Sequence, residues 1–135
     1  MSIHVCQILT ARINYRGREG EHVLDTTVKS ARGIARTFAP TWNMVMGHKQ
    51  HRILWSEYTE QYYALMRKRF QVNEEHFKEL LYADRIVLCC YCPNTSRNIR
   101  RCHRYLLADI LMKLGPRYGI DAVQLGERSN SHTST

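Results

Sequence analysis

The chain has 135 residues, of which 44% are hydrophobic, so one compact domain can bury a core without covalent cross-links. Its five cysteines are odd in number, and three of them fall within Cys89–Cys92, which is not the spacing of a secreted disulfide framework. No stretch approaches the roughly 18 apolar residues of a membrane span, and the N-terminus lacks the pattern of a signal peptide. Composition therefore argues against a membrane-spanning or disulfide-stapled protein and predicts a soluble, cytoplasmic one.

Charge indicates the chemistry of the partner. Twenty Lys and Arg residues against twelve Asp and Glu residues give a net charge of +8 and a pI near 9.5. Such an excess favours polyanions or a phosphorylated small molecule, because it attracts anions over long range and releases counterions on binding. Charge alone does not choose between these ligands, and a basic surface without a specific partner is the alternative.

Hydrophobic periodicity predicts eight elements. In chain order they are two strands, a short helix or turn, two helices, a strand, a helix and a last strand, over residues 3–11, 21–28, 37–47, 56–69, 73–81, 85–92, 102–114 and 121–126. The apolar run before Cys92 is nearly continuous, as in an interior strand covered on both faces. Residues 128–135 are polar and low in complexity, which predicts a disordered tail. This order predicts a single three-layer α/β domain over residues 1–127, with a mostly parallel sheet and flanking helices.

Ligand sites in such domains lie at the carboxyl ends of the strands. The junction between the strand 85–92 and the helix 102–114 collects basic, cysteine and histidine side chains there: Cys92, Arg97, Arg100, Arg101, Cys102, His103 and Arg104. Unpaired amides at a helix N-terminus favour an anion, and guanidinium groups donate to phosphate or carboxylate. Anion binding at this junction is the sharpest physical inference from the sequence; a structural role for the cluster is the alternative.

Two residues of the junction are candidates for catalysis. Cys102 near a helix start and among arginines would have a stabilised thiolate, which a nucleophile needs. It also falls on the apolar side of its helix, so a packed, inert cysteine is an alternative. His103 is the next residue and could carry a proton or contact an anion.

Two other chemistries fit poorly. A cysteine phosphatase needs an arginine one position further from the nucleophile than Arg97 is from Cys92. Cys89 and Cys92, with Cys102 and His103, could supply four zinc ligands, but odd separation on a strand turns the first two to opposite faces. We therefore predict neither a metal nor another cofactor.

Several segments together resemble a known family: Val23–Ser30, Phe38–Trp42, Tyr58–Tyr62, Leu88–Cys92 and Cys102–Arg104. They resemble the bacterial and phage proteins classed as domain of unknown function 488, and the likeness covers about residues 20 to 115. The resemblance implies an α/β domain with a pocket built from these segments and no settled activity. It implies pocket roles for Lys29, Ser30, Cys102, His103 and Arg104. Many members have an acidic residue just after the strand cysteine, where this chain has Tyr91-Cys-Pro93.

Three functional hypotheses follow. The first is a protein, phage-like in length and charge, that binds a nucleotide or nucleic acid. The phosphate of this ligand would contact basic, hydroxyl, thiol or imidazole groups, and the candidates are Lys29, Ser30, Arg97, Arg101, Cys102, His103 and Arg104. The base would stack on an aromatic ring, and the candidates are Trp42, Tyr58 and Tyr62. The tyrosines also share the core face of their helix. The second is an enzyme that acts on nucleotides or nucleic-acid bases through Cys102 or His103. The third is a basic interaction protein that docks an acidic host protein.

Overall fold

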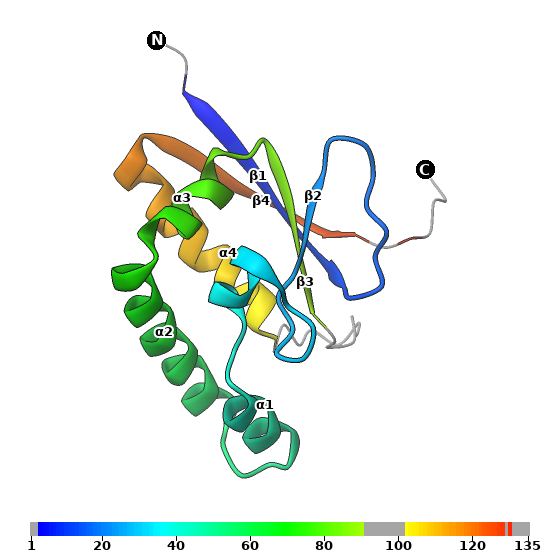
Figure 1. Cartoon of the computed structure of the whole chain (residues 1–135), viewed down its shortest axis with the longest axis vertical. Helices are drawn as coiled ribbons and strands as arrows, with labels where there is room; N and C mark the ends of the chain where they lie inside the picture. The colour runs from blue at the N-terminus through cyan, green and yellow to red at the C-terminus, as the bar shows by residue number, and fades with distance from the viewer. Residues whose placement is uncertain (1–2, 91–101, 129, 131–135) are drawn as a thin grey trace.

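A computed structural model describes residues 3–90, 102–128 and 130 of the chain. In chain order its elements are β1 (His4–Arg12), β2 (His22–Asp25), η1 (Gly33–Phe38), α1 (Trp42–Lys49), α2 (Trp55–Val72), α3 (Glu74–Tyr82), β3 (Arg85–Cys90), α4 (His103–Leu114), η2 (Gly115–Tyr118) and β4 (Ile120–Arg128). The strands form one four-stranded sheet in the order β2-β3-β1-β4, and every pair is parallel (Figure 1). The predicted α/β class, with a parallel sheet and flanking helices, is confirmed.

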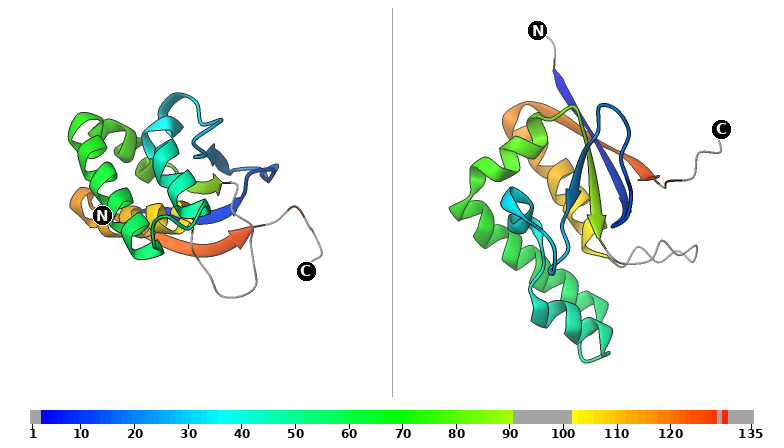
Figure 2. Two further views of the ribbon diagram at one scale, coloured as in Figure 1. Left: turned by 90° about the horizontal axis from the view of Figure 1, so that it is seen from below. Right: turned by 45° about the vertical axis from the view of Figure 1, so that its right-hand side comes forward.

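The strand order decides which face each connection crosses. From β2 to β3 and from β3 to β4 the chain moves across the sheet in one direction, and from β1 to β2 it moves in the other. Because crossovers between parallel strands are right-handed, connections that run in opposite directions lie on opposite faces. The helices therefore gather on one face of the sheet (Figure 2), and the loop after β1 crosses the other.

The larger apolar core lies between the helices and one face of the sheet. Alternate strand residues point into it, as the two-residue period of a strand requires; among them are Cys6, Ile8, Leu24, Ile86 and Leu88. Residues at helical spacing meet them from the helices, including Tyr58, Tyr62, Met66, Phe77, Leu80, Leu81, Leu107 and Leu111. This core fixes α4 against the sheet, so that its first turn lies beside the end of β3.

A smaller apolar cluster covers the opposite face. Leu9, Ala11, Val87 and Cys89 point away from the helices, and Tyr15 from the loop after β1 packs on them. The layer on this face is thus a loop rather than a helix. Residues 86–90 are all buried, which confirms the prediction of an interior strand covered on both faces.

Some helix boundaries differ from the predicted ones. The short helix, predicted within residues 37–47, begins at Trp42, because Thr41 caps it by accepting a hydrogen bond from the Met44 amide at 3.2 Å. The next helix begins one residue before Ser56, where the Glu57 carboxylate accepts from the Leu54 amide at 2.8 Å. Both devices satisfy amides that a helix start leaves without a partner.

The last strand is longer than the sequence indicates. It includes Arg128, the first residue of the predicted tail, and the Arg128 Nε donates to Glu21 Oε2 at 3.1 Å. Just beyond it, the Asn130 side chain donates to the Asn14 carbonyl at 2.9 Å. These contacts tie the end of β4 to the loop after β1. Across the described ranges, the longest apolar helices remain too short or too polar to cross a membrane.

Candidate functional site

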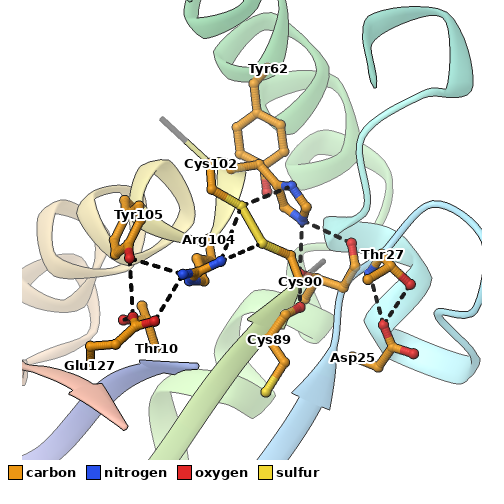
Figure 3. Close-up of a disulfide and its surroundings, with 12 residues drawn as sticks. Thr10, Asp25, Thr27, Tyr62, Cys89, Cys90, Cys102, Arg104, Tyr105 and Glu127 are labelled. Carbon is orange, nitrogen blue, oxygen red and sulfur yellow. Dashed lines mark hydrogen bonds and ion pairs between the residues drawn. A yellow bond between two sulfur atoms is a disulfide. The ribbon is translucent and has the colours of Figure 1, made fainter. Parts of the chain in front are cut away.

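The candidate site lies where the chain segments that follow two neighbouring strands leave toward opposite faces of the sheet. β1 and β3 are adjacent; β1 is followed by a loop on one face of the sheet, and β3 leads to α4 on the other. In open α/β sheets this divergence is where ligands bind, outside the carboxyl ends of the strands. The ends of β3 and β4 and the start of α4 meet there (Figure 3).

Buried polarity is concentrated at this place. Within the described part of the chain, six polar or charged residues are buried as a whole, namely Thr10, Thr26, Thr27, Thr37, His103 and Arg104. All except Thr37 belong to the carboxyl ends of strands, the loop that follows β2, or the first turn of α4. Burying a polar group costs free energy unless it is hydrogen-bonded, so a cluster of such groups indicates a role beyond packing for this part of the fold.

Arg104 is the centre of the cluster, and its side chain is 0% exposed. Its Nη1 lies 2.9 Å from Cys90 Sγ and 3.5 Å from Cys102 Sγ. Its Nη2 donates to Glu127 Oε2 at 2.8 Å and to the Tyr105 hydroxyl at 3.0 Å. The guanidinium therefore joins the end of β3, the start of α4 and the end of β4 (Figure 3).

Glu127 supplies the negative charge that this burial requires. Its carboxylate also accepts hydrogen bonds from the Tyr105 hydroxyl, at 3.1 Å, and from the Thr10 hydroxyl of β1. Charge-assisted, multiply bonded pairs of this kind are the ones that hold a buried arginine. Arg104 thus joins the elements around the site, and its direct contact with a ligand stays a prediction.

Two cysteines meet in front of the Arg104 guanidinium. Cys90, the last residue of β3, and Cys102, the N-cap of α4, form a disulfide, and both are buried (Figure 3). The sequence did not predict this pair. In this state Cys102 is not a free thiol, so a nucleophilic role requires that the bond be reduced first.

The tautomer of His103 follows from its partners. Its Nε2 lies 2.9 Å from both the carbonyl oxygen and the hydroxyl of Thr26. The carbonyl can only accept, and the Thr26 hydroxyl donates its own proton to the Cys89 carbonyl at 2.8 Å. Nε2 therefore carries the hydrogen, and Nδ1 keeps its lone pair. Nδ1 lies 4.0 Å from Cys102 Sγ.

His103 is also held neutral. Burial lowers the pKa of His103 from 6.5 to about 4; the hydrogen bond to the Thr26 backbone opposes this change, and the nearby Arg104 adds to it. At neutral pH the ring is thus neutral, and its Nδ1 lone pair lies on the side of Cys102 Sγ. By contrast, burial raises the pKa of Cys89 to about 12 and that of Cys6 to about 11, so these two free cysteines stay protonated.

The loop after β2 is ordered by one carboxylate. Asp25 accepts from the amide and hydroxyl of Thr27, at 2.9 and 2.7 Å, and from the hydroxyl of Ser30. This arrangement leaves Lys29 at the exposed tip, where its Nζ lies 5.8 Å from the centre of the half-exposed Trp42 ring. Lys29 and Trp42 therefore form a cation–aromatic pair on the surface of the loop.

Other predicted residues lie elsewhere. Tyr58 and Tyr62 are buried in the core, and the Tyr62 hydroxyl donates to the Phe38 carbonyl at 2.8 Å, as expected of the core face of their helix. Neither ring is available at the surface to stack on a base. The remaining predicted residues of the junction, Cys92, Arg97, Arg100 and Arg101, lie outside the described residues.

Sequence reasoning missed Cys90, Thr26 and Glu127. Strand alternation could have found Cys90, because it shares the helix-facing side of β3 with Ile86 and Leu88, whereas Cys89 faces the other way. Cys90, Cys102 and His103 form a buried group whose sulfur and nitrogen atoms all lie within 4.8 Å of one another, close enough to hold a metal ion. No local signal marks Thr26 or Glu127, because their roles depend on strand order.

Fold and site together define an open, all-parallel α/β domain with a cysteine–histidine–arginine cluster at its switch point. A family model described as the active DUF488-N3 subclade, DUF488-N3a, matches residues 2–115. The chain belongs to this family, which confirms the resemblance noted from Cys102-His-Arg104 and the other segments. Neither the curated proteins nor the solved structures gave a match.

Proposed function

We propose that this domain binds a phosphate-bearing ligand, a nucleotide or a nucleic acid, at the carboxyl edge of its sheet. The observation that carries the proposal is that five of the six polar or charged residues that are buried in the described part of the chain lie at the switch point. Burying polar side chains costs free energy, so a cluster of them indicates a role other than packing. Switch points are the usual ligand sites of open α/β sheets.

Three groups at this edge suit a phosphate and a base. α4 begins beside the end of β3, so the positive end of its dipole lies at this edge of the sheet. Lys29, in the loop after β2 that Asp25 orders, supplies an exposed positive charge. Trp42 beside it offers a half-exposed ring on which a base can stack. The basic net charge favours the encounter with any such ligand.

The test is equilibrium binding of nucleoside mono-, di- and triphosphates, inorganic phosphate and short oligonucleotides at two salt concentrations. Lys29→Ala should weaken every phosphate ligand by about tenfold, because one charge-assisted contact is lost. Trp42→Leu should weaken nucleotides and spare inorganic phosphate. Lys113→Ala is the matched control, since this exposed lysine lies about 15 Å along α4 from the site.

The outcome that contradicts the proposal is clear. If no member of the panel binds the wild-type chain, or if Lys113→Ala weakens binding as much as Lys29→Ala, the switch point is not a phosphate site. An acidic protein partner would then be the hypothesis to pursue, through the salt dependence of its complex.

A second candidate is an enzyme that acts on such a ligand through Cys102 and His103. The observation that favours it is the Nδ1 lone pair of a neutral His103, 4.0 Å from Cys102 Sγ, with the Arg104 guanidinium 3.5 Å from the same sulfur. Once the bond to Cys90 is reduced, His103 can accept the thiol proton and Arg104 can stabilise the thiolate. The description of the matching subclade as active agrees with a reaction.

This second candidate function predicts that the cysteine thiols differ in their rates of alkylation. In the reduced chain Cys102 should react with iodoacetamide much faster than the buried Cys6 and Cys89, whose pKa values are raised. Any turnover of a bound nucleotide should disappear in Cys102→Ser and persist in Cys89→Ala. Equal alkylation of Cys102, Cys6 and Cys89 would rule out an activated nucleophile.

A further inference from the structure

We propose that Cys90, Cys102 and His103 bind a zinc ion when the two cysteines are reduced. Cys90 comes from the end of β3 and the other two from the start of α4, and all three side chains are buried. Their ligand atoms, two sulfurs and one ring nitrogen, lie within 4.8 Å of one another. This site goes beyond phosphate binding and does not depend on it.

The distances suit tetrahedral coordination. With Zn–S bonds of about 2.3 Å and Zn–N bonds of about 2.0 Å, neighbouring ligand atoms lie roughly 3.5–3.8 Å apart. Cys102 Sγ and His103 Nδ1 are already 4.0 Å apart. The Cα atoms of Cys90 and Cys102 are 7.7 Å apart, a separation that leaves room for an ion between two thiolates. Three protein ligands also leave a fourth position for water or substrate, as in catalytic zinc sites.

The surroundings of the three ligands match those of a metal site. A metal-binding histidine donates its other ring N–H to a carbonyl or carboxylate, and His103 Nε2 does so to the Thr26 carbonyl at 2.9 Å. Nδ1 is thereby left as the nitrogen that can coordinate. Arg104 Nη1 lies 2.9 Å from Cys90 Sγ and 3.5 Å from Cys102 Sγ, where it would stabilise both sulfurs as thiolates once the disulfide is reduced.

Charge balance favours a divalent ion in this buried place. Two thiolates neutralise Zn²⁺, and Glu127 neutralises Arg104 at 2.8 Å. The cluster then carries no net charge, so the cost of burying an isolated charge does not arise. Because thiolates and an imidazole are the donor atoms, a borderline-soft ion such as Zn²⁺ is preferred to Mg²⁺ or Ca²⁺.

The disulfide and the metal site are two states of the same pair. Two equivalents of a small thiol reduce the Cys90–Cys102 bond to two Cys thiols, and the reductant becomes its own disulfide. Zn²⁺ then replaces the two thiol protons, which are released to solvent. A bound ion takes the sulfur lone pairs and Nδ1, so metal binding and a Cys102 nucleophile with a His103 base are alternative uses of the same atoms.

The experiment is titration of the reduced full chain with Co²⁺ in the absence of oxygen, followed by competition with Zn²⁺. Cobalt bound by thiolates gives a sulfur-to-metal charge-transfer band and the strong visible bands of a tetrahedral ion. We expect one Co²⁺ per chain, displaced by Zn²⁺. Cys90→Ser and Cys102→Ser should each weaken binding by about 100-fold or more, because loss of a direct ligand exceeds the effect of losing an outer contact.

Controls separate the site from other thiols and from misfolding. Cys89→Ala, a change in the adjacent residue on the opposite face of β3, should leave the cobalt spectrum unchanged. His103→Gln should keep the charge-transfer band but weaken binding, since both thiolates remain. Wild-type protein oxidised to the disulfide should bind no cobalt. Circular dichroism of each variant verifies the fold.

Two results would overturn the proposal. One is a reduced, folded wild-type chain that shows no sulfur-to-cobalt band. The other is a band that persists unchanged in both Cys90→Ser and Cys102→Ser. Neither result affects phosphate binding, which is measured with Lys29→Ala and without metal.

Discussion

Replacing Glu127 with glutamine tests whether the Arg104–Glu127 pair holds the site together. The substitution keeps the size of the side chain but leaves a fully buried guanidinium without its counter-charge. Removing one partner of a buried pair costs about 3–5 kcal/mol. The Glu127 side chain is 20% exposed, and glutamine keeps one acceptor oxygen, so we expect a loss of about 3 kcal/mol. For 135 residues this corresponds to a fall in Tm of about 10 °C.

The assay is urea and thermal denaturation of the reduced chain, so that the Cys90–Cys102 bond contributes equally to every variant. Glu75→Gln is the control, because Glu75 is 83% exposed and its ion pair with Lys78 at 3.5 Å contributes under about 1 kcal/mol. A Glu127→Gln variant no less stable than Glu75→Gln would refute the reasoning. Arg104→Met combined with Glu127→Leu should recover part of the loss, since no unpaired charge remains.

Two further predictions concern stability. Because the pKa of His103 falls from 6.5 in the unfolded chain to about 4 in the fold, its contribution is complete above pH 6.5 and is lost as the pH falls through 4, about 3 kcal/mol in all. Urea midpoints between pH 7 and pH 4 should show this loss in the wild type and in His51→Gln, and a clearly smaller one in His103→Asn. Gly115→Ala should cost about 2 kcal/mol in urea denaturation, because its Cβ would lie 2.7 Å from the Ile120 carbonyl oxygen. A variant as stable as wild type would show that η2 and β4 can move apart.

Much of the fold could be predicted because it rests on local patterns. The continuous apolar run of β3 and the helical spacing of Leu106, Leu107 and Leu111 place a buried strand before a buried helix. The carboxyl-edge location of the site then follows from parallel topology. Cap details were less predictable, since Thr41 and Glu57 act through single side chains.

The interior of the site could not be predicted, since it depends on partners distant in sequence. The basic residues before Arg104 predict a ligand contact, but they give no sign that its guanidinium is buried and bonded to Glu127, 23 positions later. Thr26 gave no sign of its role, because its contact with His103 exists only when β2 lies beside β3. The alternation of β3 could have identified Cys90 as the cysteine that faces the helices, but three cysteines within four residues made the choice between them ambiguous.

The hydrogen bond between the Thr10 hydroxyl and the Glu127 carboxylate joins residues 117 positions apart. This separation affects how the domain folds during synthesis on the ribosome. β1 emerges first and lies in the middle of the finished sheet, yet its neighbour β4 is the last strand of the described chain to be made. Until β4 arrives, Arg104 of α4 lacks the Glu127 carboxylate that it pairs with in the folded domain. A nascent chain that ends before Glu127 should therefore remain a substrate for chaperones and proteases, and release of the last strand should trigger closure of the whole domain.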